Sequence, residues 1–208
     1  YTINYIKKSG FDISYKIDIS IKGDSSMDIA KIIGKTHIKF AEFWNNKNYD
    51  LILCIGDRYE MFAAVSSSLP FNIPIAHISG GEETLGAIDN VYRHSLSLMA
   101  TYHFTNTKLN SKRVTQIIGS SKNIFHCGSL GIDNILQTNL YKIKDFEDVF
   151  KFKLCEPFIL FTYHPLTSNY KLNPLHAKII KELLSDIKLK VLVTMPNADT
   201  MSDTIRKA

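Results

Sequence analysis

Short apolar runs rich in β-branched residues alternate along the chain with longer segments in which apolar residues recur at helical spacing. This alternation is typical of a doubly wound α/β fold, in which helices connect the parallel strands of a sheet. The predicted strands are Tyr15–Ile21, Leu51–Ile55, Ile73–Ile78, Tyr102–Thr105, Asn123–Cys127, Phe158–Thr162 and Lys190–Thr194. The continuous apolarity of Leu51–Ile55 further predicts that this strand is buried.

The segments between these strands have helical periodicity, and two of them have clear start residues. Ser25 followed by Asp28 is the acidic form of a capping box, and the apolar positions after it, as far as Trp44, are expected to face the sheet. Asn173 is a predicted N-cap, with Pro174 in the first turn. Other helices are predicted at about Tyr59–Ser68 (closed by Pro70), Ile88–Met99, Lys108–Ile118, Leu130–Thr138, within 139–156 and after Thr194. In Ile88–Met99 the expected apolar stripe consists of Ile88, Val91, Tyr92, Ser95 and Met99.

Residues 139–156 interrupt the pattern, because they are polar and charged with interspersed phenylalanines. The alternation of strand and helix restarts after Pro157. We therefore predict an N-terminal domain at residues 1–155 and the start of a second domain at residues 156–208. Because the sequence begins without Met and stops inside an apparent helix, we expect it to be a piece of a longer chain.

Composition excludes several classes of protein. The 208 residues are 45% hydrophobic and carry a formal net charge of +5, which fits a globular protein. The lysines are scattered, without the basic runs of nucleic-acid-binding segments, so no nucleic-acid partner is expected. No apolar run is long enough to span a bilayer and no signal peptide opens the chain, so no membrane partner is expected. Three separate cysteines without a CxxC pair predict reduced core residues of a cytoplasmic protein; they are Cys54, Cys127 and Cys155.

Several cofactor and catalytic motifs are missing from the sequence. There is no GxGxxG after a strand, no GxxxxGK[ST] loop and no GxSxG elbow. There is also no HExxH and no Cys/His ligand cluster. We therefore expect neither a bound metal nor a bound cofactor.

Polar residues gather instead where the predicted strands end, which is where open parallel sheets bind ligands. The four groups are Gly56–Glu60, His77–Glu82, Thr162–Pro165 and Pro196–Asp199. Each of these motifs alone is common in turns and helix caps: a Gly-Asp turn, a Gly-Gly pair followed by Glu, and a His-Pro dipeptide. Their repetition at successive strand ends, with His77 and His164 among them, favours a ligand site.

Asp89 and Arg93 stand four residues apart at the start of the helix after the Gly-Gly turn. They can form an intrahelical ion pair of a few tenths of a kcal/mol. The alternative is that Asp89 projects into the same cleft as Asp57, with Arg93 holding its orientation. Two carboxylates in one partly dry cleft have separated pKa values, which suits one for acid and one for base catalysis.

With these residues assembled, the chain resembles the hydrolysing UDP-N-acetylglucosamine 2-epimerases of sialic and related nonulosonic acid synthesis. The matching segments are GDRYEM (Gly56–Met61), NIPIAHISGGEETLGAIDNVYRH (Asn72–His94), YHFTNT (Tyr102–Thr107), CGSLGIDNI (Cys127–Ile135), YHPLT (Tyr163–Thr167) and MPNADT (Met195–Thr200). The resemblance implies a GT-B-type architecture, in which two Rossmann-like domains enclose a sugar nucleotide. On that template the second domain is incomplete in this chain.

The resemblance also implies a reaction. A base removes the proton at C2 while UDP leaves C1, and water then adds at C1 while a proton returns to C2 on the opposite face. The products are UDP and N-acetylmannosamine, and the step needs neither metal nor nicotinamide. A UDP-sugar is the implied partner, and a homodimer or homotetramer the implied assembly.

Site residues carry over by position. Asp57 and Asp89 match the catalytic carboxylates of the family. His164 matches a histidine near the diphosphate, and Asn197 matches a nucleotide contact. Expected contacts to the substrate from the cleft also include Arg58, His77 and Arg93.

Ser79 departs from the family pattern, because several members have a catalytic Glu there. A serine hydroxyl cannot act as a carboxylate base at neutral pH. Either Glu82 takes the role, or Ser79 hydrogen-bonds the sugar and the aspartates do the acid and base work. A different sugar would also explain the change, and UDP-N,N′-diacetylbacillosamine is the alternative substrate. Two other classes remain, a GT-B glycosyltransferase and a non-catalytic nucleotide-sugar sensor.

Overall fold

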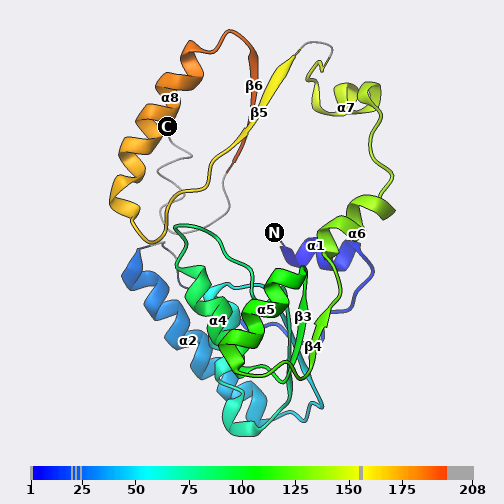
Figure 1. Ribbon diagram of the computed structural model, residues 1–208, viewed down its shortest axis with the longest axis vertical. Helices are drawn as coiled ribbons and strands as arrows, with labels where there is room; N and C mark the ends of the chain where they lie inside the picture. The colour runs from blue at the N-terminus through cyan, green and yellow to red at the C-terminus, as the bar shows by residue number, and fades with distance from the viewer. Residues whose placement is uncertain (1, 20, 22, 24, 155–156, 196–208) are drawn as a thin grey trace.

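The computed structural model describes residues 2–19, 21, 23, 25–154 and 157–195. Two separate parallel sheets organise these residues (Figure 1). Four strands form the first, in the order β1-β2-β3-β4: β1 (Ile52–Ile55), β2 (Ile75–Ile78), β3 (Tyr102–Thr105) and β4 (Ile124–His126). The second sheet pairs β5 (Phe158–Thr162) with β6 (Lys190–Thr194) in parallel. The predicted α/β class is therefore confirmed.

Helices connect successive strands in both sheets. Their bounds are α1 (Thr2–Lys8), α2 (Ser26–Asn45), α3 (Tyr59–Ser66), α4 (Asp89–Met99), α5 (Lys108–Ile118), α6 (Leu130–Gln137), α7 (Ile143–Phe150) and α8 (Asn173–Asp186). Short 3₁₀ turns occupy η1 (Leu69–Phe71) and η2 (Tyr170–Leu172). Because the first sheet adds strands in one direction, right-handed crossovers place α3, α4 and α5 on one face. Figure 1 shows α5 beside β3 and β4, with α4 next to α5.

The core of the first sheet lies under α2, α3 and α4. It consists of the buried residues Trp44, Ile52, Cys54, Val65, Ile75 and Leu96. Trp44 joins α2 to α3, because its indole Nε1 donates to the carbonyl of Ala64 (3.0 Å) and the hydroxyl of Ser67 (3.1 Å). The predicted capping box is confirmed: the Ser25 side chain accepts from the Asp28 amide, and the Asp28 carboxylate accepts from the Ser25 amide.

Several predictions about the elements are wrong. No strand forms at the described residues of Tyr15–Ile21, which have no regular structure. The strand β1 is buried on one face alone, since Leu53 is 64% exposed on the other. The helix predicted at about Tyr59–Ser68 ends at Ser66, and Pro70 is the second residue of η1. Asn173 is the first helical residue of α8 rather than its cap.

The stripe predicted for α4 is also wrong. Ile88 and Val91 are exposed, whereas Arg93, Leu96 and Ser97 are the buried residues of this helix. A prediction from the spacing of apolar residues treats an arginine as polar and therefore as exposed. The burial of Arg93 could be predicted only by knowing its ion-pair partner.

Of the cysteines, Cys54 lies in the core as predicted, and burial raises the pKa of its thiol to about 12. Cys127 is exposed, against prediction. Cys155, like the helix predicted after Thr194, lies outside the described residues. None of the described helices has both the length and the apolarity required to cross a membrane.

The turn after β2 requires glycine at Gly81. Its φ is +78°, and a Cβ there would collide with the backbone oxygen of Asn110. We expect Gly81→Ala to lower the free energy of unfolding by about 2 kcal/mol. In contrast, Gly34 lies inside α2 with nothing within 4 Å of a Cβ, so Gly34→Ala should raise that free energy by about 0.5–1 kcal/mol. Urea denaturation followed by circular dichroism measures both, and equal effects would contradict the close approach at Gly81.

Candidate functional site

The carboxyl end of the first sheet opens into a pocket of about 340 Å³, which we call the strand-end pocket. Asp57 and Arg58 reach it from the turn after β1, and Asp89 reaches it from the first residue of α4. Residues 84–87 and 164–167, which include His164, complete its lining. Loops that follow both sheets thus meet in one pocket, and three of the four predicted catalytic residues line it.

Backbone and side-chain hydrogen bonds join these two loops at residues 86–88 and 167–168. The Gly86 carbonyl accepts from the amides of Thr167 (3.2 Å) and Ser168 (3.1 Å) and from the Ser168 hydroxyl (2.8 Å). The Ile88 amide donates to the Thr167 hydroxyl at 2.9 Å. Gly86 has a φ of +74°, which disfavours any residue with a side chain, and a Cβ there would also lie 2.6 Å from Leu166 Cδ2.

Asn173 fixes the loop that contains His164. Its side chain is fully buried and pairs with the backbone of Leu166, accepting from the amide (3.0 Å) and donating to the carbonyl (2.9 Å). The residue predicted as a helix cap is therefore a support for the pocket.

Arg93 forms an ion pair with Asp57. The side chain of Arg93 is only 6% exposed and that of Asp57 is 23% exposed, so the pair is largely withdrawn from water. Arg93 also donates to the Asn90 side chain at 3.2 Å. Our hypothesis that Arg93 orients Asp89 therefore needs correction, because the carboxylate in this ion pair belongs to Asp57, and Arg93 lies behind the pocket.

The sequence did not predict a structural role for Asn90. Its side chain accepts from the Thr84 amide (2.9 Å) and donates to the Thr84 carbonyl (2.8 Å). It thereby connects Arg93 to the loop 84–87 that lines the pocket. Asparagine is common near helix starts, so its residue type alone gave no indication of this role.

His77 lies beneath the pocket and not in its lining, contrary to the prediction of a substrate contact. It is fully buried, its Nε2 lies 2.8 Å from the Gly56 carbonyl, and its Nδ1 lies 3.1 Å from the Ser97 hydroxyl. A carbonyl can only accept, so Nε2 carries the proton and Nδ1 accepts from Ser97. Burial lowers the pKa of His77 to about 4, which keeps the ring neutral. The ring supports the turn that presents Asp57.

Ser79 and Glu82 form a separate group with Asn106. Ser79 has a positive φ of +65°, and its hydroxyl lies 3.3 and 3.4 Å from the two terminal atoms of the Asn106 side chain. The Asn106 amide also donates to the Glu82 carboxylate. Neither Ser79 nor Glu82 lines the strand-end pocket. Asn197, the remaining predicted contact, lies outside the described residues.

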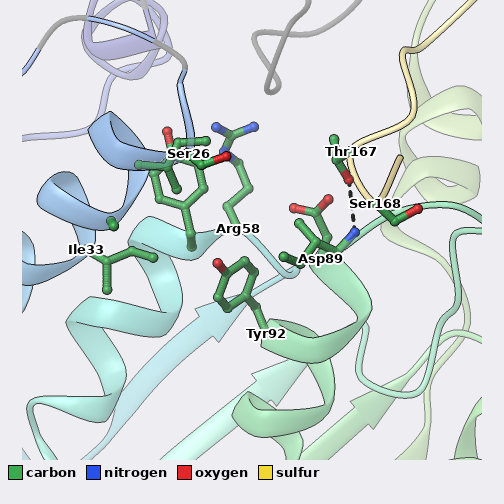
Figure 2. Close-up of a pocket in the computed structure, with 11 residues that line it drawn as sticks. Ser26, Ile33, Arg58, Asp89, Tyr92, Thr167 and Ser168 are labelled. Carbon is green, nitrogen blue, oxygen red and sulfur yellow. Dashed lines mark hydrogen bonds between the residues drawn. The ribbon is translucent and has the colours of Figure 1, made fainter. Parts of the chain in front are cut away.

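A second pocket of about 320 Å³ adjoins the first (Figure 2). We call it the side pocket. Arg58, Asp89 and Thr167 line both pockets. Within the described part of the chain, no group of three or more His, Cys, Asp or Glu residues is arranged to hold a metal ion.

The described residues thus form a Rossmann-like parallel sheet with carboxylates after its strands, and a histidine from the loop after β5 lines the same pocket. The chain matches the UDP-N-acetylglucosamine 2-epimerase family over residues 1–208, and it belongs to that family.

Two of the curated relatives are the following, each more than 30% identical to the chain. The GDP/UDP-N,N′-diacetylbacillosamine 2-epimerase (hydrolyzing) of Campylobacter jejuni is 36% identical over 190 residues, which cover 91% of this chain and 50% of that protein. Polysialic acid biosynthesis protein P7 of Escherichia coli is 34% identical over 212 residues, covering 99% and 53%. The chain thus spans about half the length of the curated relatives it matches.

Solved structures are similar in fold. The UDP-GlcNAc 2-epimerase from Neisseria meningitidis bound to UDP-GlcNAc has a TM-score of 0.73 at 16% identity, covering 99% of this chain and 58% of that one. The UDP-GlcNAc 2-epimerase of Methanocaldococcus jannaschii in complex with UDP-GlcNAc and UDP also has a TM-score of 0.73, at 15% identity, covering 98% and 56%. The predicted GT-B-type architecture with an incomplete second domain is confirmed.

The Asp57–Arg93 pair should show strong energetic coupling. A double-mutant cycle with Asp57→Asn and Arg93→Gln is expected to give about 1–3 kcal/mol, because removing either partner leaves the other poorly solvated. The control cycle uses Lys178 and Glu182, a pair at 3.9 Å with both side chains more than 60% exposed, and should give under about 0.5 kcal/mol. Equal couplings from urea unfolding curves would contradict the burial of the first pair.

The buried histidine predicts how stability depends on pH. Because the pKa of His77 is lowered when folded, the unfolded chain takes up a proton first as the pH falls. Its contribution to stability is complete above about pH 6.5, declines by about 1.4 kcal/mol per pH unit toward pH 4, and is constant below that. Urea unfolding across this range measures the slope, which should be smaller in His77→Gln. An NMR titration showing His77 protonated near pH 6.5 would contradict the prediction.

Proposed function

We propose that the protein containing this chain is a hydrolysing 2-epimerase of UDP-2-acetamido sugars. It converts UDP-N-acetylglucosamine and water to N-acetylmannosamine and UDP. The observation that carries the proposal is the convergence of Asp57, Asp89 and His164 on one pocket in a chain of this family. The pocket is lined by loops that follow both sheets. Such a site suits a sugar nucleotide, which has a sugar at one end and a nucleotide at the other.

The chemistry needs two proton-transfer groups and a stabilised leaving group. A carboxylate takes the C2 proton, the electrons of that bond form the C1–C2 double bond, and the C1–O bond to the diphosphate breaks. An acid then delivers a proton to C2 from the other face, water bonds to C1 through its oxygen, and the excess proton of that water passes to the carboxylate left by the acid. The C2 hydrogen is weakly acidic, so positioned carboxylates and charge stabilisation at the diphosphate must supply much of the acceleration.

We assign the two proton transfers to Asp57 and Asp89, which line the strand-end pocket from adjacent loops. We assign the stabilisation of the departing diphosphate to His164 and Arg58, which line the same pocket. Glu82 is held by Asn106 outside this lining, which supports the aspartates over Glu82 as the acid and base.

The relatives support two substrates. Those of Campylobacter jejuni and Legionella pneumophila are named as 2-epimerases of N,N′-diacetylbacillosamine nucleotides, and the Escherichia coli relative is named for polysialic acid biosynthesis. UDP-N,N′-diacetylbacillosamine is therefore the alternative substrate.

The proposal also includes the division into domains at residues 1–155 and 156–208, a cytoplasmic location, and assembly as a homodimer or homotetramer. Exposed apolar side chains on α6, among them Leu136 at 78%, are compatible with such an assembly.

The test is a product analysis with the full-length protein in D₂O, followed by NMR. The expected products are UDP and N-acetylmannosamine carrying deuterium at C2, since the returning proton comes from solvent. Asp57→Asn should lower turnover by about 10²-fold or more. The control Asp50→Asn, an exposed carboxylate outside both pockets, should leave it unchanged.

An epimerised sugar still attached to UDP would contradict the hydrolysing reaction. Absence of UDP release from either candidate substrate would remove the proposal altogether.

A further inference from the structure

The side chain of Asn90 makes three hydrogen bonds, and none of them is a helix cap. Its Oδ1 accepts from the Thr84 amide (2.9 Å) and from the Arg93 guanidinium (3.2 Å), and its Nδ2 donates to the Thr84 carbonyl (2.8 Å). An asparagine that caps a helix accepts from an amide in the first turn of that helix. Asn90 is already the second residue of α4, and the backbone to which it bonds precedes the helix.

The two bonds to Thr84 fix the plane of the Asn90 amide. Thr84 begins the loop 84–87, whose large apolar residue, Leu85, is 91% exposed and contributes little packing. Hydrogen bonds hold this loop instead: it binds Asn90 at one end, and at the other it accepts from the amides of residues 167 and 168. The Oδ1 of Asn90 is thereby directed at Arg93 from a backbone that is itself anchored.

The contact with Asn90 restricts the guanidinium of Arg93. Its Nη2 donates to Asp57, and its Nη1 donates to Asn90. Its Nε is buried and has no hydrogen-bond partner among the residues that the structure describes. Within that part of the chain, two partners therefore orient the guanidinium. Without Asn90, the ion pair is free to rotate about its remaining contact, and the Asp57 carboxylate rotates with it.

From these contacts we propose that Asn90 is a positioning residue for the reaction, acting through Arg93 on the orientation of Asp57. Asn90 lines neither the strand-end pocket nor the side pocket, so it is assigned no contact with the substrate. This role rests on the proposed function, to which it adds a residue. Proton transfer requires the carboxylate and the C2 hydrogen to be aligned, and a displacement of about 1 Å can lower a rate by about 10²-fold.

Steady-state kinetics of UDP release by the full-length protein test this role, with whichever candidate sugar the wild type converts. Asn90→Ala removes all three hydrogen bonds and should lower kcat by about tenfold or more, while KM changes by less than about threefold. Asn46→Ala is the matched control and should leave both constants unchanged. Asn46 also donates to a backbone carbonyl, that of Glu42 (2.8 Å), but at the end of α2 and outside both pockets.

A double-mutant cycle tests whether Asn90 acts through Arg93. In an Arg93→Gln background, Asn90→Ala should lower kcat by less than about a further threefold, because the guanidinium that Asn90 orients is absent. Asn90→Asp serves as a second variant if Asn90→Ala does not fold, as judged by circular dichroism. It keeps the size of the side chain, but its carboxylate competes with Asp57 for Arg93, so kcat should fall by about threefold or more.

Equal losses of kcat in the two backgrounds would overturn the role of Asn90, because it would then act independently of Arg93. A raised KM with unchanged kcat would also overturn it, since Asn90 would then contribute to substrate binding. If the wild type releases UDP from neither candidate sugar, the proposed function itself fails, and the role of Asn90 fails with it.

Discussion

The arrangement of the site depends on the burial of one guanidinium. Arg93 is almost inaccessible to water, and a charge in that position is tolerated only when an opposite charge meets it. Asp57 provides that charge from the turn after β1, so the ion pair ties the end of the first strand to helix α4. The same helix begins with Asp89 and carries Asn90, whose side chain holds Thr84. One ion pair therefore sets the spacing between the two candidate proton-transfer groups.

A second layer of polar contacts supports the turns from below. His77 joins β2 to the Gly56 turn and to Ser97 of α4. At Gly80 a Cβ would lie 2.8 Å from the Ser97 hydroxyl and 3.1 Å from His77 Nδ1, so the chain must pass close to this network. The glycines that resemble a flexible turn in the sequence are needed because the backbone packs directly on buried polar groups. His77 supports the turn that presents Asp57. A histidine at a strand end suggested a contact with a ligand, but its burial prevents such a contact.

The sequence predicted those features that depend on local pattern. The bounds of β3, β5, β6 and α5 were correct to the residue, because each is a short periodic run between clear breaks. Features that depend on distant partners were missed. The burial of Arg93 follows from Asp57, 36 positions away, and the role of Asn173 follows from Leu166 on a separate loop. For Tyr15–Ile21 the apolar alternation was real, but alternation forms a strand only where a neighbouring strand accepts its hydrogen bonds.

Asp89 lies where the two pockets meet and lines both of them. Asp89 is the first residue of α4, so its carboxylate lies near the positive end of the helix dipole. Tyr92, one turn later, faces the side pocket, so any group that fills that pocket presses on the same helical turn that carries Asp89. The side pocket and the strand-end pocket therefore depend on one structural element, the first turn of α4.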